Sequence, residues 1–555
     1  MQWKRQGKGL LTATSTGREE QSADVLSQEV TAVQAAPPAL EQKPHSLGTK
    51  IMRSVVFGGL RYVFIAPIPF IMTPLILHKI GVAGYGTWAV FLAVNGLTSL
   101  ADLGLVGTLS KFVAEYHARR DFPALGRLLG SGLTLFLLLD LVLSTAVWFA
   151  SPLLVERLFR GSMIPGAELV SLLRCFLIVI AANILSQLFA SVTTGLQRLD
   201  LTHIMSAANA IMSAGFAAVL LLRGAGLHGL VYGYIGSAVL TIAVYIVLVR
   251  KLLPHVALNP FLFNRTEARK MFGYSLRLYI TQAAVAVHNQ VEKVFLAIFI
   301  GVAPVGWYDI ASDTALKLRG AIGLILSPVL PAASELDALG DKSRMRELYY
   351  RSHKYLALVG VPVVCFMAAV SRRFVELWLG PHLTMISLPL AVLLAVNFFN
   401  LATGPGFMIF AGTGNLGPGV RSALLAIVLN IFLSLGLIYR FGFTGAVIGT
   451  AGALTLASAY FMMLFHRETG FPVIRILREG YLKPAVVSVV VLCSILAIRS
   501  PKNLSWFGLV GMGLVFGALY SFFILQSGFF DEYDWNKVQF FVPLARHARR
   551  IVRIA

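Results

Sequence analysis

Blocks of apolar residues separated by short polar stretches run along most of the chain. Most blocks are about 20–28 residues long, which is the length an α-helix needs to cross roughly 30 Å of hydrocarbon. They predict an all-α polytopic membrane protein with about fourteen spanning helices, over residues 53–78, 85–109, 128–155, 168–196, 202–222, 228–250, 271–300, 304–332, 354–379, 384–411, 419–439, 443–465, 484–499 and 504–526.

Composition supports the same class. Of the 555 residues, 57% are hydrophobic and only 13% are charged, whereas a soluble domain carries about 25% charged residues. The net charge of +21 comes mainly from Lys and Arg in the loops on one side. That bias follows the positive-inside rule and predicts that both termini are cytoplasmic. The expected partner of this charge is the lipid bilayer and not nucleic acid.

The span pattern divides the chain into two six-helix halves with additions at both ends. The amino-terminal residues lack an apolar run and are typical of a disordered cytoplasmic tail. The carboxy-terminal residues predict a basic amphipathic tail on the membrane surface or bound to a partner. The expected segments are 1–50 (tail), 51–250 (first half), 251–270 (cytoplasmic linker), 271–466 (second half), 467–526 (linker and helices thirteen and fourteen) and 527–555 (basic tail).

The two halves carry an internal repeat. Residues 81–88 (GVAGYGTW) are echoed by 301–308 (GVAPVGWY), 220 positions later. Asn209 with 226–229 (GLHG) is echoed by Asn430 with 442–445 (GFTG). Since each half has an even number of spans, the repeats should be parallel, with a substrate site between them near mid-membrane. Chance similarity of Gly-rich turns is the alternative.

One hairpin, 270–332, is unusually charged for a membrane segment. An ionised group at mid-bilayer is unfavourable by roughly 2.5–3.5 kcal/mol on insertion scales, so these side chains should face protein or water. The ionisable residues of the hairpin are Arg277, Glu292, Lys293, Asp309, Asp313, Lys317 and Arg319.

These charges allow two interpretations. The cations would line an internal cavity that binds an anionic substrate; the candidates are Arg277, Lys317, Arg319 and Lys293, with Arg61 of the first span. The other candidates would serve ion coupling or a structural network: Asp309, Asp313, Glu292, Asp140 and His288. Asp313 and Lys317 are spaced to form a local ion pair. The alternative is that the charges satisfy one another and only hold the hairpin in place.

Particular residues also resemble a known family. The chain is similar to Wzx-type polysaccharide biosynthesis flippases, of the multidrug/oligosaccharidyl-lipid/polysaccharide exporter superfamily, over about 53–470. The resemblance is carried by Pro74, Gly81, 85–88 (YGTW), 102–105 (DLGL), Gly306, Tyr308, Ala311 and Pro331.

The resemblance implies translocation of a polyprenyl-diphosphate-linked oligosaccharide across the bacterial inner membrane by alternating access. Our hypothesis is that a gradient of an ion, H⁺ or Na⁺, or of the substrate drives transport, and a polysaccharide synthesis complex is a further candidate partner. One departure is residues 290–293 (QVEK), which stand where relatives often carry an Asp followed by a basic residue. A cation-coupling role at this place is therefore not carried over from the resemblance.

Nothing in the sequence indicates an enzyme. There is no GxxxxGK[ST] loop, and the loops are too short for a glycosyltransferase or ligase. The three cysteines lie in apolar spans without ligands at metal-binding spacing, so we expect no metal site, cofactor or disulfide framework. Two other functions remain open, a multidrug or cation exporter of the same superfamily and a non-transporting scaffold of a synthesis complex.

Overall fold

The computed structural model describes residues 65–97, 104–256, 259–271 and 290–534, and this part of the chain is helical without any strand. Within it, eleven helices are long and apolar enough to cross a membrane. The predicted fold class, an all-α polytopic membrane protein, is therefore confirmed. The two terminal tails lie mostly outside the described residues.

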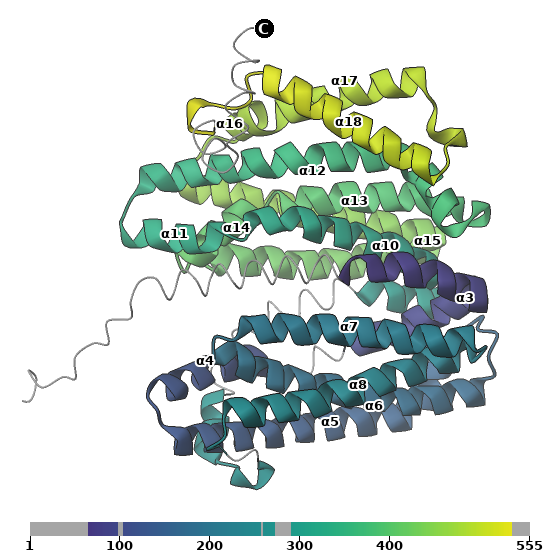
Figure 1. Cartoon of the computed structure of the whole chain (residues 1–555), viewed down its shortest axis with the longest axis vertical. Coiled ribbons are helices and arrows are strands. Elements are labelled where there is room, and N and C mark those ends of the chain that lie inside the picture. Colours follow the sequence, from purple (N-terminus) through teal and green to yellow (C-terminus); the bar gives the residue numbers. More distant parts are fainter. Residues whose placement is uncertain (1–64, 98–103, 257–258, 272–289, 535–555) are drawn as a thin grey trace, which may run out of the picture. The chain divides into compact units, whose positions relative to one another are not determined.

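The first half forms a bundle in which α5, α6 and α8 lie side by side and α7 packs on α8 (Figure 1). Its helices are α3 (Pro67–Leu97), α4 (Leu105–Ala118), α5 (Phe122–Leu158), α6 (Gly166–Gly195), α7 (Leu199–Leu222) and α8 (Gly226–Leu252), followed by the short η2 (Pro260–Leu262).

In the second half, a helical segment over 290–299 leads into a bundle in which α13 packs against α10, α12 and α15. Helices α17 and α18 pair with each other and pack along α12 (Figure 1). The helices are α10 (Val302–Gly323), η3 (Leu324–Leu326), α11 (Val329–Ala338), α12 (Lys342–Leu379), η4 (Pro381–Ile386), α13 (Ser387–Leu401), α14 (Gly404–Gly412), α15 (Gly417–Thr469), α16 (Val473–Arg475), η5 (Ile476–Leu482), α17 (Lys483–Ile498), η6 (Pro501–Asn503) and α18 (Trp506–Gln526).

Two of the long helices reverse direction at a glycine. The 53 residues of α15 would extend about 80 Å as a straight helix, far more than one membrane crossing. At Gly442 the backbone takes φ 58°, which only glycine adopts readily. Beyond this point the helix folds back, so that Ser422 Oγ donates a hydrogen bond of 2.9 Å to the carbonyl oxygen of Ala457. Helix α3 turns in the same way at Gly81.

Several predicted spans are broken where the sequence holds glycine or proline. The span expected over 304–332 is divided into α10 and α11, with Pro328 preceding α11, and the span over 384–411 is divided before Gly404 and Pro405. Proline lacks the N–H that a continuous helix requires. Because the bent helices hold more than one crossing and 272–289 lie outside the described residues, the count of fourteen stays a prediction.

The repeated turns meet in the structure. Gly86 and Gly306, which are equivalent in the two repeats, lie against each other, and a Cβ atom added to Gly306 would lie 3.2 Å from the Cα atom of Gly86. Contact between equivalent residues is what a local two-fold axis requires. Helices α3 and α10 pack closely at these turns, and they bring residues near position 85 next to residues near position 309.

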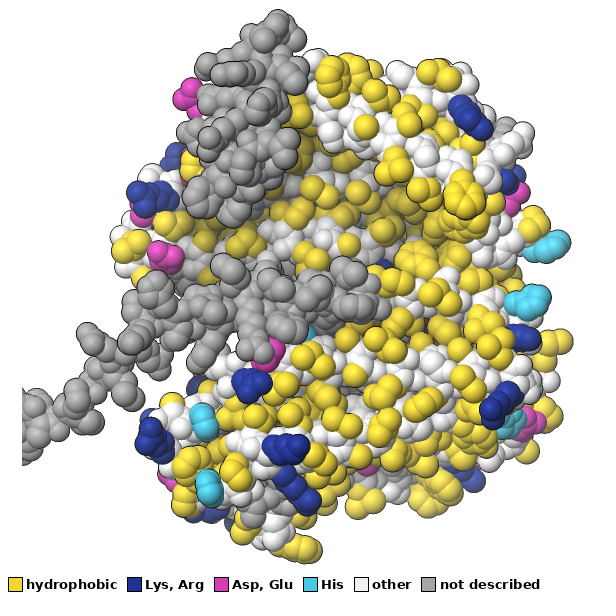
Figure 2. All heavy atoms as spheres, viewed as in Figure 1, with side chains coloured by type: hydrophobic (Ala, Val, Ile, Leu, Met, Phe, Trp, Pro, Cys, Tyr) yellow, Lys and Arg dark blue, Asp and Glu magenta, His cyan; other side chains and the backbone are white. Residues whose placement is uncertain are grey.

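The outer face is suited to lipid. Large apolar side chains such as Phe149, Phe432 and Leu514 are between 69% and 78% exposed, and hydrophobic side chains cover most of the helices on the face that Figure 2 shows. Lys and Arg gather near the helix ends in the same view. This distribution is typical of helices surrounded by hydrocarbon and flanked by polar headgroups.

Candidate functional site

A buried ion pair joins the two arms of the charged hairpin. Lys293 Nζ lies 2.6 Å from Asp309 Oδ1, and their side chains are only 12% and 8% exposed. Tyr85 of the first half donates a hydrogen bond of 2.8 Å to Asp309 Oδ2. The pair therefore also links α3 to α10, at the place where the repeated turns meet.

Glu292, the neighbour of Lys293, lies in a second buried polar group. Its Oε1 atom accepts hydrogen bonds from Asn430 Nδ2 and, at 2.8 Å, from Thr450 Oγ1. The hydroxyl of Tyr308 lies 2.8 Å from Thr450 Oγ1. Because the Thr450 hydroxyl has a single hydrogen and donates it to Glu292, Tyr308 is the donor in this second contact. These residues connect the segment 290–299 to both arms of α15.

Three oxygen atoms of this second group are buried without a hydrogen-bond partner in the part of the chain that the structure describes. They are Glu292 Oε2, Asn430 Oδ1 and Ser434 Oγ. Ser434 lies one helical turn after Asn430 on α15. Buried oxygen atoms without partners are unfavourable by about 1–3 kcal/mol each, and a carboxylate among them is the chemistry that a proton or a hard cation satisfies.

The other charged residues of α10 contact side chains within the second half. Lys317 Nζ is 2.6 Å from Asp313, so the local pair that the spacing predicted is present. Arg319 Nη2 donates a hydrogen bond of 2.9 Å to Asn400 Oδ1, and Asn400 Nδ2 donates one of 2.9 Å to Ser458. Arg319 Nε is buried without a partner among the described residues.

The remaining predicted site residues fall elsewhere. Arg61, Arg277 and His288 lie outside the described residues, so their roles stay predictions. Asp140 lies on α5, where Ser144 of the next turn donates a hydrogen bond of 3.2 Å to it. No described contact joins Asp140 to the charged hairpin.

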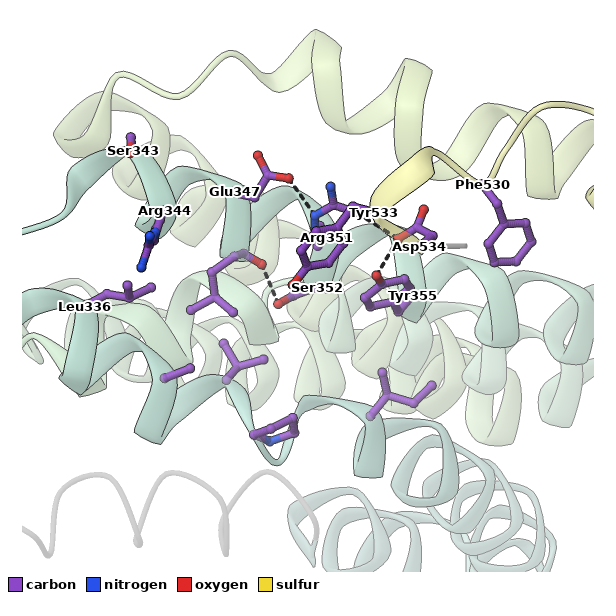
Figure 3. A pocket seen from close by; sticks show the side chains of 15 residues that line it. Leu336, Ser343, Arg344, Glu347, Arg351, Ser352, Tyr355, Phe530, Tyr533 and Asp534 are labelled. Atoms are coloured by element: carbon purple, nitrogen blue, oxygen red, sulfur yellow. Dashed lines mark hydrogen bonds and ion pairs between the residues drawn. The ribbon is translucent and has the colours of Figure 1, made fainter. Parts of the chain in front are cut away.

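A cavity of about 1060 Å³ lies between α11, α12 and the segment after α18 (Figure 3). Most of its lining is apolar, and its polar edge includes Arg344, Glu347 and Ser352. On that edge the buried Asp534 accepts hydrogen bonds from Arg351 Nη1 at 2.8 Å and from Tyr355 at 2.6 Å. This anchors the segment after α18 to α12.

An apolar groove of about 660 Å³ runs between α12 and α18. Pro362 and Phe366 of α12 face Gly513 and Phe516 of α18 across it. The lining of the groove includes Leu318 of α10, which lies between Lys317 and Arg319 in sequence. The groove shares Phe530 with the cavity between α11 and α12.

A third cavity, of about 490 Å³, lies inside the first half and is lined largely by neutral polar side chains. The sequence analysis considered charged side chains and did not predict this cavity. Amide side chains within apolar spans could have indicated it, namely those of Asn95, Asn183, Gln187 and Asn209. Its lining residues are Asn95, Gly96, Asn183, Ser186, Gln187, Ala190, Met205, Ser206, Asn209, Thr241 and Tyr245.

Known structures share this architecture. The chain is similar to the lipid II flippase MurJ in an inward closed conformation, with a TM-score of 0.66 and 16% identity over 86% of this chain and 97% of that one. It is also similar to an inward-facing multidrug resistance MATE family transporter of the MOP superfamily, with a TM-score of 0.59 and 15% identity over 74% and 98% of the two chains. At such identities the likeness establishes the fold.

Two sequence relatives come from Haloferax volcanii. One is named "Probable low-salt glycan biosynthesis flippase Agl15" and is 21% identical over 72% of this chain and 80% of that protein. Another, "Probable flippase AglR", is 21% identical over 70% and 78%. Both are described as flippases and neither as an enzyme, in agreement with the prediction from the sequence.

A family model described as "Polysaccharide biosynthesis protein" matches residues 51–337, which is more than half of the chain. This match covers the first half, the charged hairpin and α11. It agrees with the resemblance that the sequence motifs indicated, and the chain therefore belongs to the polysaccharide biosynthesis protein family.

Proposed function

We propose that this protein is a flippase that moves a polyprenyl-diphosphate-linked oligosaccharide across the bacterial inner membrane by alternating access. The observation that carries the proposal is the apolar groove between α12 and α18, whose lining includes Leu318 of α10, the residue between Lys317 and Arg319 in sequence. Such a substrate has a long hydrocarbon tail joined to an anionic diphosphate. The groove suits the tail, and Lys317 and Arg319, the neighbours of Leu318 on α10, would bind the diphosphate.

The cations have different tasks in this proposal. Lys317 is 25% exposed and paired with Asp313, so a phosphate oxygen would compete with that carboxylate for the ammonium. Arg319 holds Asn400 through one nitrogen while its Nε has no partner among the described residues. A guanidinium in this state retains a donor for a phosphate oxygen.

The proposal is tested with purified protein in vesicles that contain a fluorescent lipid-linked oligosaccharide. We expect Lys317→Met and Arg319→Gln each to lower the translocation rate at least tenfold, because each loses a charge-assisted hydrogen bond of about 1.5–3 kcal/mol to the diphosphate. Arg440→Gln, at the end of the first arm of α15, is the matched control. Unchanged rates in both α10 variants would contradict the role of these cations.

We further propose that Glu292 binds the coupling ion, H⁺ or Na⁺. The support is the set of partnerless buried oxygens from Glu292, Asn430 and Ser434. Glu292→Gln keeps the shape but removes the charge that a cation or proton would neutralise. In vesicles with an imposed Na⁺ or pH gradient, the variant should lose the acceleration by the gradient while retaining substrate binding. Equal acceleration in wild type and variant would rule the site out.

A further inference from the structure

The neutral cavity of the first half is chemically unlike the charged hairpin. It lies among α3, α6, α7 and α8, and no carboxylate, ammonium or guanidinium belongs to its described lining. Four amide side chains line it instead, from Asn95, Asn183, Gln187 and Asn209. Polar side chains inside membrane helices are unfavourable and usually mark a pathway or a binding site.

These side chains do not exhaust one another's hydrogen-bonding capacity. Asn183 Nδ2 donates to Asn95 Oδ1 at 3.1 Å, and Thr241 donates to Asn209 Oδ1 at 2.9 Å. An amide has two donor and two acceptor sites, so Asn183 and Asn209 keep sites that these contacts do not use.

Three further polar side chains line the cavity without a side-chain hydrogen bond in the described part of the chain. They are Ser186 and Gln187 of α6 and Ser206 of α7. A group that only stabilises the bundle would be expected to bond within it. Free donors and acceptors that face one cavity indicate a ligand with matching groups.

We propose that this cavity is a carbohydrate subsite that binds the sugars of the lipid-linked glycan. The inference rests on the proposed flippase function and extends it. Sugar hydroxyls are neutral and both donate and accept, as amides and serine hydroxyls do. A phosphate would require a cation, which the described lining lacks. The volume of about 490 Å³ falls within the roughly 300–1,000 Å³ of small-molecule sites.

A division of labour between the halves follows. The second half supplies cations and a groove for the diphosphate and the tail, and the first half supplies neutral hydrogen-bonding groups for the glycan. Tyr245, buried on the wall, adds an aromatic side chain to it. Selectivity for the sugar would then be set by the first half, because a ligand that displaces water from these amides without offering matching hydroxyls leaves them without hydrogen bonds.

The test measures binding to purified protein in nanodiscs. One probe is undecaprenyl diphosphate without sugar, and the others carry a single glucose, galactose or N-acetylglucosamine. We expect wild type to bind at least one sugar-bearing probe about tenfold more tightly than the bare lipid, as one or two added hydrogen bonds would give. Gln187→Leu and Asn183→Leu should remove this preference and leave the affinity for the bare lipid unchanged.

Asn397→Leu is the matched control, because this buried amide of α13 donates, among the residues that the structure describes, to the backbone of its own helix alone; it should keep the preference. If a leucine variant does not fold, Ser206→Ala repeats the test with a smaller change. A wild type that shows no preference, or variants that retain it, would overturn the subsite and leave the flippase standing. A wild type that binds neither kind of probe would overturn the proposed function itself.

Discussion

At the scale of single residues, the pair of Lys293 and Asp309 combines two opposing effects. Both side chains are almost fully buried, and desolvating two charges offsets most of their attraction. The pair is thus a weak source of stability while both partners are present. Removing one partner is a different matter, because the other charge remains buried without compensation.

This predicts strong coupling between the two positions. Lys293→Met alone should lower the free energy of unfolding by about 3–5 kcal/mol, and Asp309→Leu alone should do the same. The double variant should recover most of the loss, since no isolated charge remains. Thermal unfolding of the purified variants measures the coupling, and simply additive losses would show that the pair is not desolvated as the structure indicates.

At the scale of secondary-structure elements, the contact between α3 and α10 depends on a glycine. A Cβ atom added to Gly86 would lie only 1.9 Å from the carbonyl oxygen of Val302. Gly215 of α7, by contrast, has no atom within 4 Å of an added Cβ. The two helices can therefore approach this closely only because position 86 lacks a side chain.

We expect Gly86→Ala to reduce the free energy of unfolding by about 1–3 kcal/mol, the usual range for overpacking. Gly215→Ala serves as the control and should be neutral or slightly stabilising, since alanine has the higher helix propensity. Parallel thermal unfolding of both variants gives the comparison. Equal effects at the two positions would mean that α3 and α10 separate easily.

The segment after α18 is held by acidic residues, which makes its attachment sensitive to pH. Burial opposes ionisation of Asp531, but the backbone N–H of Asp534 and the Arg351 side chain hydrogen-bond to its carboxylate, and Lys354 attracts it. Together they lower the pKa of Asp531 to about 2. A carboxyl group with a lowered pKa stabilises the folded state above its unfolded pKa of about 3.9.

That stabilisation should be complete at pH 7 and disappear as the pH falls from about 4 toward 2. Hydrogen exchange of the amides in 527–534 should therefore become faster, relative to the intrinsic rate, over this interval. Asp531→Asn should show the faster relative exchange already at pH 7, with a weaker response to acid. A wild type without a change below pH 4 would show that Asp531 does not hold the segment.

Across the whole molecule, the sequence predicted features that depend on local pattern. Apolar length predicted most of the spanning helices, and the repeat placed the turns at Gly81, Gly301 and Gly442. Pairing of Asp313 with Lys317 followed from helical spacing. Helical spacing did not predict the contacts of Asp309 with Tyr85 and of Glu292 with Asn430, because they join residues more than a hundred positions apart. The amide cavity went unnoticed because its members are dispersed over four helices and carry no charge.

Alternating access, as proposed for this protein, would act on the same long-range contacts. Tyr85 and Gly86 of the first half meet Gly306 and Asp309 of the second. This contact lies beside the repeated turns, at the end of the helices that the loop charges predict to be opposite the cytoplasm. If the halves rock, the contact between α3 and α10 must loosen during each cycle.

A disulfide across this contact should therefore stop transport. Tyr85→Cys combined with Gly306→Cys is a suitable pair, because a Cβ atom at Gly306 would lie 3.3 Å from the ring atom Cδ1 of Tyr85, so that the two positions are neighbours across the contact. We expect oxidation to abolish translocation in vesicles and a reductant to restore it.

The reduced form is the matched control, because it carries the same two substitutions. Each single-cysteine variant should be insensitive to oxidant. Undiminished transport by the fully oxidised double variant would show that this end of α3 and α10 stays closed throughout the cycle, and the moving gate would then have to lie at the opposite end of the helices.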